Sequence, residues 1–310
     1  MRIVVIKAYL FLLLSVCLAC GTNGQTAAVQ TVNEVINSGL IGVKTVADFG
    51  AKLDGKTDDS NAIRESLNKQ GYAFIPFTPE GIRVNQTIQI KNGQKIEGAT
   101  RGVNIISGVN SGAYTFVMSG IPFNGSAYLQ NFSLSFINSG ANGIKITESR
   151  FANILDFSII GKKKCGIGVY IEGVEKGSAW NIIDRYSISS CTVSAIKLES
   201  FNKNPFVNRN YIGFGVAQSC EIGLWIKRGG TNTSLINPQN CGIGILIDEQ
   251  SHSNRIDTFM ESCDVSLDIR GTSRNNLISG NLSVKKLGGQ GKNTVWNLTI
   301  PKMRELSKKD

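Results

Sequence analysis

A short phrase recurs five times in the second half of the chain: a cysteine, two or three residues, then a small residue that opens an alternating apolar run. It begins at Cys165, Cys191, Cys220, Cys241 and Cys263. These cysteines lie 26, 29, 21 and 22 residues apart. Self-similarity at a period of roughly 20–30 residues is typical of stacked supersecondary units. The repeat therefore predicts a solenoid.

Most of the chain has a hydrophobic period of two, as in Ile82-Arg-Val84 and Ile88-Gln-Ile90. Short runs rich in Val and Ile, bounded by Gly, Asn and Ser, are typical of β-strands. Helices do not alternate with these runs, which excludes βαβ winding, and an antiparallel sandwich would not repeat one phrase at this period. The expected fold class is all-β: a parallel β-solenoid of about ten coils from residue 72 onward, with strands ~4.8 Å apart.

One helix is expected over residues 57–70, where Thr57 or Asp58 can cap its N-terminus and Gly71 ends it. The ends of a solenoid expose strand edges that must be covered. We expect this helix to cap the N-terminal end, and the tail from Asn293 onward to cover the other.

A second phrase recurs between the cysteines, in which an asparagine precedes an isoleucine-containing pair. It begins at Asn153, Asn181, Asn210, Asn254 and Asn276. Asparagine tolerates the left-handed backbone of a tight turn, and stacked amides can hydrogen-bond from coil to coil. The phrase predicts an asparagine ladder along the solenoid axis.

The first twenty residues resemble a bacterial lipoprotein signal, with a basic start, a short apolar stretch and a final Leu18-Ala19-Cys20-Gly21. The resemblance implies lipidation of Cys20. Because Cys17 stands where such signals usually have leucine, simple cleavage and secretion is the alternative. Residues 21–40 are interpreted as a tether and residues 41–310 as the folded domain. The expected location is the bacterial cell envelope or the medium, with membrane contact through the lipid only.

Five cysteines remain after the signal, an odd number at equivalent repeat positions. Free cysteine behaves as a small buried hydrophobe, so we expect an inward-facing stack of unpaired thiols. A metal site would need C-x-x-C pairs or nearby histidines, and the sequence has neither at these positions.

Residues 45–98 closely resemble the opening segment of the pectate-lyase superfamily, which rhamnogalacturonase-, polygalacturonase- and epimerase-like proteins share with some phage tailspikes. The matching motifs are Asp48-Phe49-Gly50-Ala51, Asp54-Gly55 and Thr57-Asp58-Asp59. The resemblance implies a single-stranded right-handed parallel β-helix and an exported carbohydrate-active protein. It also implies that Asp58 and Asp59 belong to a helix-capping motif rather than to a catalytic pair.

The resemblance does not select the chemistry, because one fold hosts many activities. The Asn-Thr-Asp, Gly-His-Gly and Arg-Ile-Lys strings of polygalacturonases do not occur in this sequence, which argues against an ordinary pectin hydrolase. A uronate lyase or an epimerase-like enzyme remains. The alternatives are a non-catalytic glycan-binding or structural protein and, less favoured, a tailspike-like adhesin.

Alignment of the repeats predicts two rows of side chains that point outward, with one residue from each coil. The first reads Lys145, Tyr170, Lys197, Trp225, Leu246 and Asp268. Lysines between aromatic rings would suit an acidic polysaccharide, so the first four are candidate substrate-binding residues, together with Arg255. The alternative is a set of ordinary surface residues.

The second row places Asp156 and Asp184 on neighbouring coils, with carboxylates ~5 Å apart. Such a pair can share a proton, act as acid and nucleophile, or bind Ca²⁺. A uronate lyase must neutralise the substrate carboxylate and remove the adjacent proton, for which Arg185 beside a base would suffice. Asp156, Asp184 and Arg185 are therefore candidate catalytic residues; the alternative is that aspartate begins a turn.

His252, the single histidine, lies in a loop near Arg255 and is a further candidate base, or a solvated loop residue. The net charge of +10 suggests an anionic partner, and an acidic polysaccharide fits best. The basic residues are dispersed and follow an export signal, which argues against nucleic acid. The oligomeric state stays open, with a trimer among the possibilities.

Overall fold

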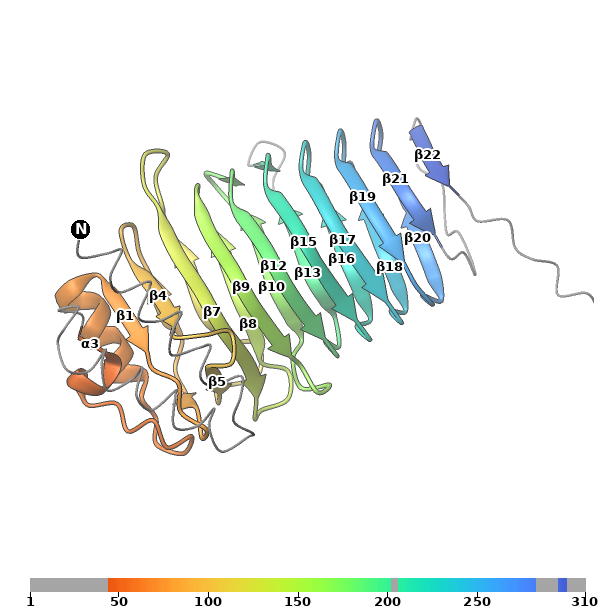
Figure 1. The fold of residues 1–310 in the computed structure, drawn as a ribbon. Helices are drawn as coiled ribbons and strands as arrows, with labels where there is room; N and C mark the ends of the chain where they lie inside the picture. Colours follow the sequence, from red (N-terminus) through yellow and green to blue (C-terminus); the bar gives the residue numbers. More distant parts are fainter. Residues whose placement is uncertain (1–43, 202–205, 283–294, 300–310) are drawn as a thin grey trace, which may run out of the picture.

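The computed structural model describes residues 44–201, 206–282 and 295–299. Two sheets wind together as successive coils (Figure 1). Sheet A contains β1 Tyr72–Ile75, β2 Ile82–Val84, β4 Lys95–Gly98, β5 Asn104–Ser107, β7 Ala127–Phe136, β9 Ala152–Ile160, β12 Ile182–Ser189, β15 Tyr211–Gln218, β17 Thr233–Gln239, β19 Arg255–Met260, β21 Leu277–Leu282 and β22 Val295–Thr299. Sheet B contains β3 Ile88–Ile90, β6 Tyr114–Ser119, β8 Asn142–Thr147, β10 Ile167–Gly173, β13 Ser194–Ser200, β16 Ile222–Lys227, β18 Ile243–Asp248 and β20 Val265–Ile269.

Every strand pairs in parallel with its counterpart in the next coil, which confirms the predicted parallel β-solenoid. Sheet B has eight strands, so the described residues form about eight turns rather than ten. The early coils are longer than the average repeat because they carry extra loops. Two of these loops, in successive coils, hold the short strands β11 (Ser178–Ala179) and β14 (Val207–Asn208), which pair as a small third sheet.

The core lies between the two sheets and is built from apolar rows in register. In sheet B one row runs through Ile144, Val169, Ile196, Leu224, Ile245 and Leu267. All six are buried. Each coil therefore presents its apolar strand face to the same interior, as a period of two requires.

The five repeat cysteines are buried and unpaired, as predicted. Each thiol lies close to the next along the axis. The hydrogen bond with Cys191 raises the pKa of Cys220 to about 12, and the one with Cys220 raises the pKa of Cys241 to about 11. A thiol must ionise to react, so these cysteines pack as apolar residues.

The asparagine ladder is present at the turns that precede five successive strands of sheet A, from β12 to β21. Each side-chain amide donates to the side-chain oxygen of the next, at 2.9–3.0 Å, through Asn181, Asn210, Asn232, Asn254 and Asn276. The partners are 29 residues apart at first and 22 apart in the later coils. All five are buried, so the ladder satisfies polar groups that water does not reach.

The sequence predicted a residue at one end that does not belong to the ladder, and it missed one residue in the middle. Asn153 pairs with Ile182, one residue past the ladder position. That position in the β9 coil is Ala152, whose backbone N–H donates to the side-chain oxygen of Asn181 at 2.9 Å. Asn232 completes the ladder, although Thr233 and Ser234 follow it in place of the apolar pair of the phrase.

One α-helix, α3 at Ser60–Gln70, occurs among the described residues; it covers the N-terminal end of the solenoid and is preceded by a 3₁₀ turn, η1, at Val46–Phe49. The helix begins later than residue 57 because Asp59 is its N-cap. Its face of Ala62, Ile63 and Leu67 is buried. No helix in the described part of the chain is long and apolar enough to span a membrane.

At the other end, β22 pairs with β21. The rest of the predicted C-terminal cap lies outside the described residues, as do the signal with Cys20 and the tether.

Candidate functional site

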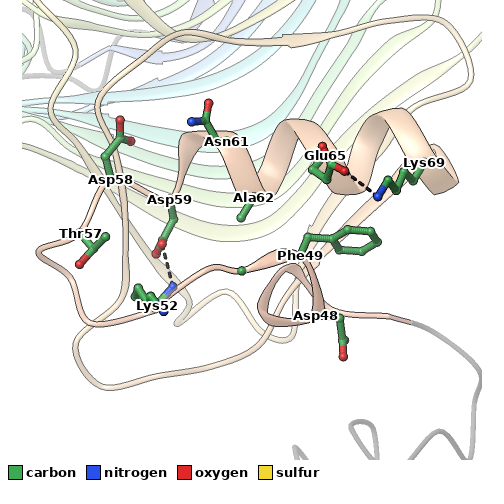
Figure 2. A pocket seen from close by; sticks show the side chains of 11 residues that line it. Asp48, Phe49, Lys52, Thr57, Asp58, Asp59, Asn61, Ala62, Glu65 and Lys69 are labelled. Atoms are coloured by element: carbon green, nitrogen blue, oxygen red, sulfur yellow. Dashed lines mark hydrogen bonds and ion pairs between the residues drawn. The ribbon is translucent and has the colours of Figure 1, made fainter.

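A hollow of about 450 Å³ lies between η1 and α3 and is lined by several acidic residues (Figure 2). The carboxylate of Asp59 accepts the backbone N–H groups of Lys52 and Leu53, at 2.7 and 3.0 Å. Burial opposes the ionisation of Asp58, yet hydrogen bonds from Ser60 and Asn85 lower its pKa. Asp58 accepts the backbone N–H of Ser60 at the start of the helix, and Asp59 holds the segment that leads into it. Both carboxylates therefore have a structural role, as the motif predicts.

The predicted line of Lys145, Tyr170, Lys197 and Trp225 lies in register on sheet B, across strands β8, β10, β13 and β16. The ammonium of Lys197 lies 4.2 Å from the Trp225 ring centroid and 5.3 Å from that of Tyr170. The ammonium of Lys145 lies 5.8 Å from the Tyr170 ring. These are cation–π distances, so the lysines cover the rings rather than standing free of them.

Two buried glutamates accompany this line and were missed in the sequence. Lys145 pairs with Glu172, and Lys197 pairs with Glu199 at 2.7 Å. The hydroxyl of Tyr170 donates to Glu199 at 2.8 Å. The sequence does contain a signal for them. Glu172 follows Tyr170 by two residues, and Glu199 follows Lys197 by two residues; side chains two residues apart lie on the same face of a strand.

The sheet B line is therefore a charge-compensated and largely buried network. Tyr170 is only 6% exposed. Burial opposes the ionisation of Glu199, but hydrogen bonds from Lys197 and Tyr170 bring its pKa below the ordinary value. Burial and the neighbouring Glu199 raise the pKa of Tyr170. The carboxylate stays ionised and the phenol neutral, so this face supplies little free positive charge for a polyanion.

On sheet A the structure brings together Asp156, Asp184 and Arg185. The guanidinium of Arg185 donates from Nε and Nη2 to Asp156, at 2.6 and 2.7 Å, and from Nη1 to Asp184 at 2.9 Å. The second oxygen of Asp184 accepts the backbone N–H of Phe214 at 3.0 Å. A cation thus bridges the two carboxylates.

The sequence predicted that Asp156 and Asp184 occupy the same position in neighbouring coils, and this alignment was wrong by one residue. Asp184 pairs with Leu155, and Asp156 lies opposite Arg185 between the paired residues on either side. Asp156 and Arg185 both have φ of 53°, so each coil bulges at this point. The misalignment follows from treating Asn153 as a ladder residue.

The cluster is exposed, and two neighbours missed in the sequence extend it. Arg185 is 52% exposed, and the ring of Phe214, opposite it on β15, is 64% exposed. Arg101 reaches the same wall from the loop after β4 and donates to the carbonyl of Phe157 at 2.8 Å. The wall of sheet A therefore combines guanidinium groups, carboxylates and an open ring.

The contacts of Asp156 and Asp184 do not fit a calcium site. The hydrogen bond from Arg185 lowers the pKa of Asp156, and both carboxylates already bind that guanidinium. Ca²⁺ takes six to eight oxygen ligands, and a cation between these two oxygens would displace Arg185. Over the described residues, no group of three or more His, Cys, Asp or Glu side chains is placed to hold a metal ion.

His252 and Arg255 lie elsewhere on the solenoid. Both are exposed at the start of β19, three strands from β12 in sheet A, or roughly 14 Å by strand spacing. The His252 ring lies over Gly230 of the neighbouring coil, where an added Cβ would meet it at 2.6 Å. The structure does not bring either residue to Asp184, and it places Arg255 on a different sheet from the lysine and aromatic line.

No protein-family model matches the chain, and no curated protein is found to be similar. Among solved structures, the chain is similar to the phiAB6 tailspike in complex with three-repeat oligosaccharides of Acinetobacter baumannii surface polysaccharide (17% identity, TM-score 0.58, covering 86% of this chain and 49% of that one). It is also similar to ORF18 of Geobacillus virus E2 (14% identity, TM-score 0.55, covering 83% of this chain and 61% of that one). A third similar structure is the tailspike of Acinetobacter phage vB_ApiP_P1 (12% identity, TM-score 0.50, covering 84% of this chain and 59% of that one).

The chain thus spans roughly half to three fifths of the length of these proteins. At such low identity the likeness establishes the fold alone. The chain is a parallel β-helix protein with the architecture that these phage proteins share.

Proposed function

We propose that the chain is an exported β-helix protein that binds an acidic polysaccharide on the outer wall of sheet A and acts on it as a uronate lyase or an epimerase-like enzyme. The observation that carries the proposal is the exposed cluster of Asp184, Arg185 and Phe214. The resemblance of residues 45–98 to the pectate-lyase superfamily supports it, and so does the oligosaccharide complex of the phiAB6 tailspike.

The cluster has the groups that this chemistry requires. A uronate carboxylate that pairs with Nη1 of Arg185 would take the place of Asp184 and free that carboxylate as a base. Asp184 would remove the C5 proton of the sugar. In a lyase the electron pair would form the C4–C5 double bond and expel the C4 oxygen, which would take a proton from water; in an epimerase, water would return a proton to C5 from the opposite face. Asp156 holds Arg185 through two hydrogen bonds and positions it.

Non-catalytic binding is the second candidate, and a specific observation favours it. Both carboxylates are bound to Arg185, and this contact lowers the pKa of Asp156, so neither is a free base in the unliganded protein. A binding protein would use the same wall of sheet A without forming a product.

One panel separates the candidates. The protein is mixed with polygalacturonate, alginate or hyaluronan, with and without added Ca²⁺, and both binding and the ultraviolet absorbance of unsaturated uronate are measured. We expect saturable binding that salt weakens, with affinity lowered about tenfold or more in Arg185→Ala and less in Trp225→Ala. Loss of product in Asp184→Asn with binding retained supports the enzyme.

Asp257→Asn is the matched control, because Asp257 is also an exposed aspartate on sheet A, three strands away on β19. We expect it to bind and to react like the parent protein. Binding without unsaturated product in any arm would exclude the lyase and leave the epimerase-like enzyme and the binding function. An absence of binding to all three polysaccharides would refute the proposed function.

We also propose that the chain is exported and anchored by a lipid on Cys20, because residues 1–20 resemble a lipoprotein signal. In a bacterium that produces the full chain, Cys20→Ala is expected to move the protein from the membrane fraction to the soluble fraction. Ser15→Ala, inside the apolar stretch, is the control. Equal distributions of the Cys20→Ala and parent proteins would contradict the anchor.

A further inference from the structure

Each coil makes the same tight turn just before its ladder residue. In successive coils the turn residue is Phe151, Trp180, Arg209, Thr231, Ser253 and Asn275, and every one has a φ between 52° and 60°. This left-handed backbone is costly for bulky side chains and easier for asparagine. The later coils show that the turn does not require a ring.

The bulky turn residues of the first three of these coils, Phe151, Trp180 and Arg209, form a cluster at the surface. The rings of Phe151 and Trp180 are stacked, 6.1 Å apart and 13° from parallel. Phe123, from the loop after β6, packs edge-on against both, at 5.6 and 5.4 Å. The guanidinium of Arg209 lies 5.4 Å from the Trp180 ring centroid. We call these four residues the aromatic platform.

The platform is partly open to solvent. Phe123 is 62% exposed and Arg209 is exposed, while Phe151 and Trp180 are half-buried. Two of these rings stand on left-handed backbone that is costly for a bulky residue. Strain of this kind is found where the surrounding structure serves a ligand.

Arg209 lies against the platform, and Arg255 and Arg274 lie two and three coils further along the same edge. None of these three arginines forms an ion pair within the described part of the chain. The row two residues before the ladder has no acid either; it reads Arg150, Ala179, Asn208, Gly230, His252 and Arg274. This edge is the opposite of the sheet B line, where both lysines have a glutamate.

We propose that the aromatic platform is a binding site for a sugar ring that carries a carboxylate. The C–H-rich face of a pyranose would stack on the exposed ring of Phe123, which Phe151 and Trp180 hold in place, and its carboxylate would pair with Arg209. The inference rests on the proposed polysaccharide-binding function, but the platform lies on the turn edge, away from the exposed cluster of Asp184, Arg185 and Phe214.

The test uses substitutions that remove the ring without straining the turn. Trp180→Asn places a residue that tolerates positive φ, so we expect an unchanged or higher melting temperature together with an affinity lowered about tenfold or more. Thr231→Asn, the same change at an equivalent turn position without a ring, is the matched control and is expected to bind normally. Trp180→Phe should retain most of the affinity.

The role of Arg209 is tested with polygalacturonate, alginate and hyaluronan, each beside its carboxyl-reduced form. Arg209→Gln should weaken binding of the acidic forms about tenfold and leave any binding of the reduced forms unchanged. Normal binding by both Trp180→Asn and Arg209→Gln would overturn the platform. If Trp180→Asn does not fold, Arg209→Gln decides alone.

The two proposals fail differently. If the parent protein binds none of the three polysaccharides, the proposed function and the platform fall together. If the parent binds and Arg185→Ala weakens binding while the platform variants do not, only the platform is refuted.

Discussion

Replacing Asn232 with alanine is expected to lower the free energy of unfolding by roughly 3–5 kcal/mol. The side-chain oxygen of Asn232 accepts the backbone and side-chain N–H groups of Asn210, at 3.1 and 2.9 Å. Its amide donates to the carbonyl of Val207 and to Asn254, both at 3.0 Å. Truncation leaves several buried polar groups without a partner, and each such group costs about 1–3 kcal/mol.

Asn153→Ala is the matched control, because Asn153 is also buried and one residue out of the ladder register. Its side-chain amide donates to the carbonyl of Phe151 at 2.9 Å and contributes no bond to the ladder. We expect a loss of about 1 kcal/mol in urea denaturation, consistent with a single hydrogen bond. Equal losses in the two variants would show that the ladder does not hold the coils together.

Replacing Glu199 with glutamine is expected to cost roughly 3–5 kcal/mol of stability, because it breaks a buried ion pair by removing one partner. Glu199 is 7% exposed and pairs with Lys197 at 2.7 Å and with Lys227 at 3.3 Å. Glutamine keeps the shape but leaves Lys197 without its counter-charge, whereas Lys227 retains its pair with Glu249. The measurement is urea denaturation at neutral pH.

Glu65→Gln supplies the surface control. Glu65 pairs with Lys69 at 2.7 Å on the outside of α3, with both side chains largely exposed. Exposed pairs of this kind contribute about 0.5 kcal/mol or less. If both glutamine variants cost the same, burial does not set the strength of the sheet B network.

The same network sets a dependence on pH. Although burial opposes it, hydrogen bonds from Lys197 and Tyr170 hold the pKa of folded Glu199 below its ordinary value of 4.5. A depressed pKa means that the stabilisation is fully present above the unfolded pKa and is lost as the pH falls through the folded value. The parent protein should therefore lose more stability on acidification than Glu199→Gln does, and parallel pH profiles would contradict this.

Much of the fold followed from local pattern. The cysteine phrase repeats because each coil must place a small apolar residue at the same point of a shared interior, and those thiols are buried as predicted. Strand alternation placed Lys145, Tyr170, Lys197 and Trp225 correctly in one line. The helix-capping role of Asp58 and Asp59 was also readable, because its motif is local.

The candidate site was less predictable. Asp156, Asp184 and Arg185 do lie together, but a one-residue bulge decides that Arg185, and not Asp184, faces Asp156. A slip of one residue reverses the face of every side chain in a strand, and repeat spacing does not resolve it. Arg101 reaches the cluster through its hydrogen bond to the carbonyl of Phe157, a residue 56 positions later in the sequence. No local sequence pattern predicts such a contact.

The sequence by itself determined the architecture, because period, turn residues and apolar alternation are properties of neighbouring residues and recur in every coil. Only the tertiary structure decided which charges are free. It paired the lysines of the recurring line with Glu172 and Glu199, and it assembled the exposed ring of Phe123 and the half-buried rings of Phe151 and Trp180 beside Arg209, which forms no ion pair in the described part of the chain. The physical reason is that compensation of a charge depends on distances of a few ångströms between coils, and those distances are set by register, bulges and loops rather than by the repeat itself.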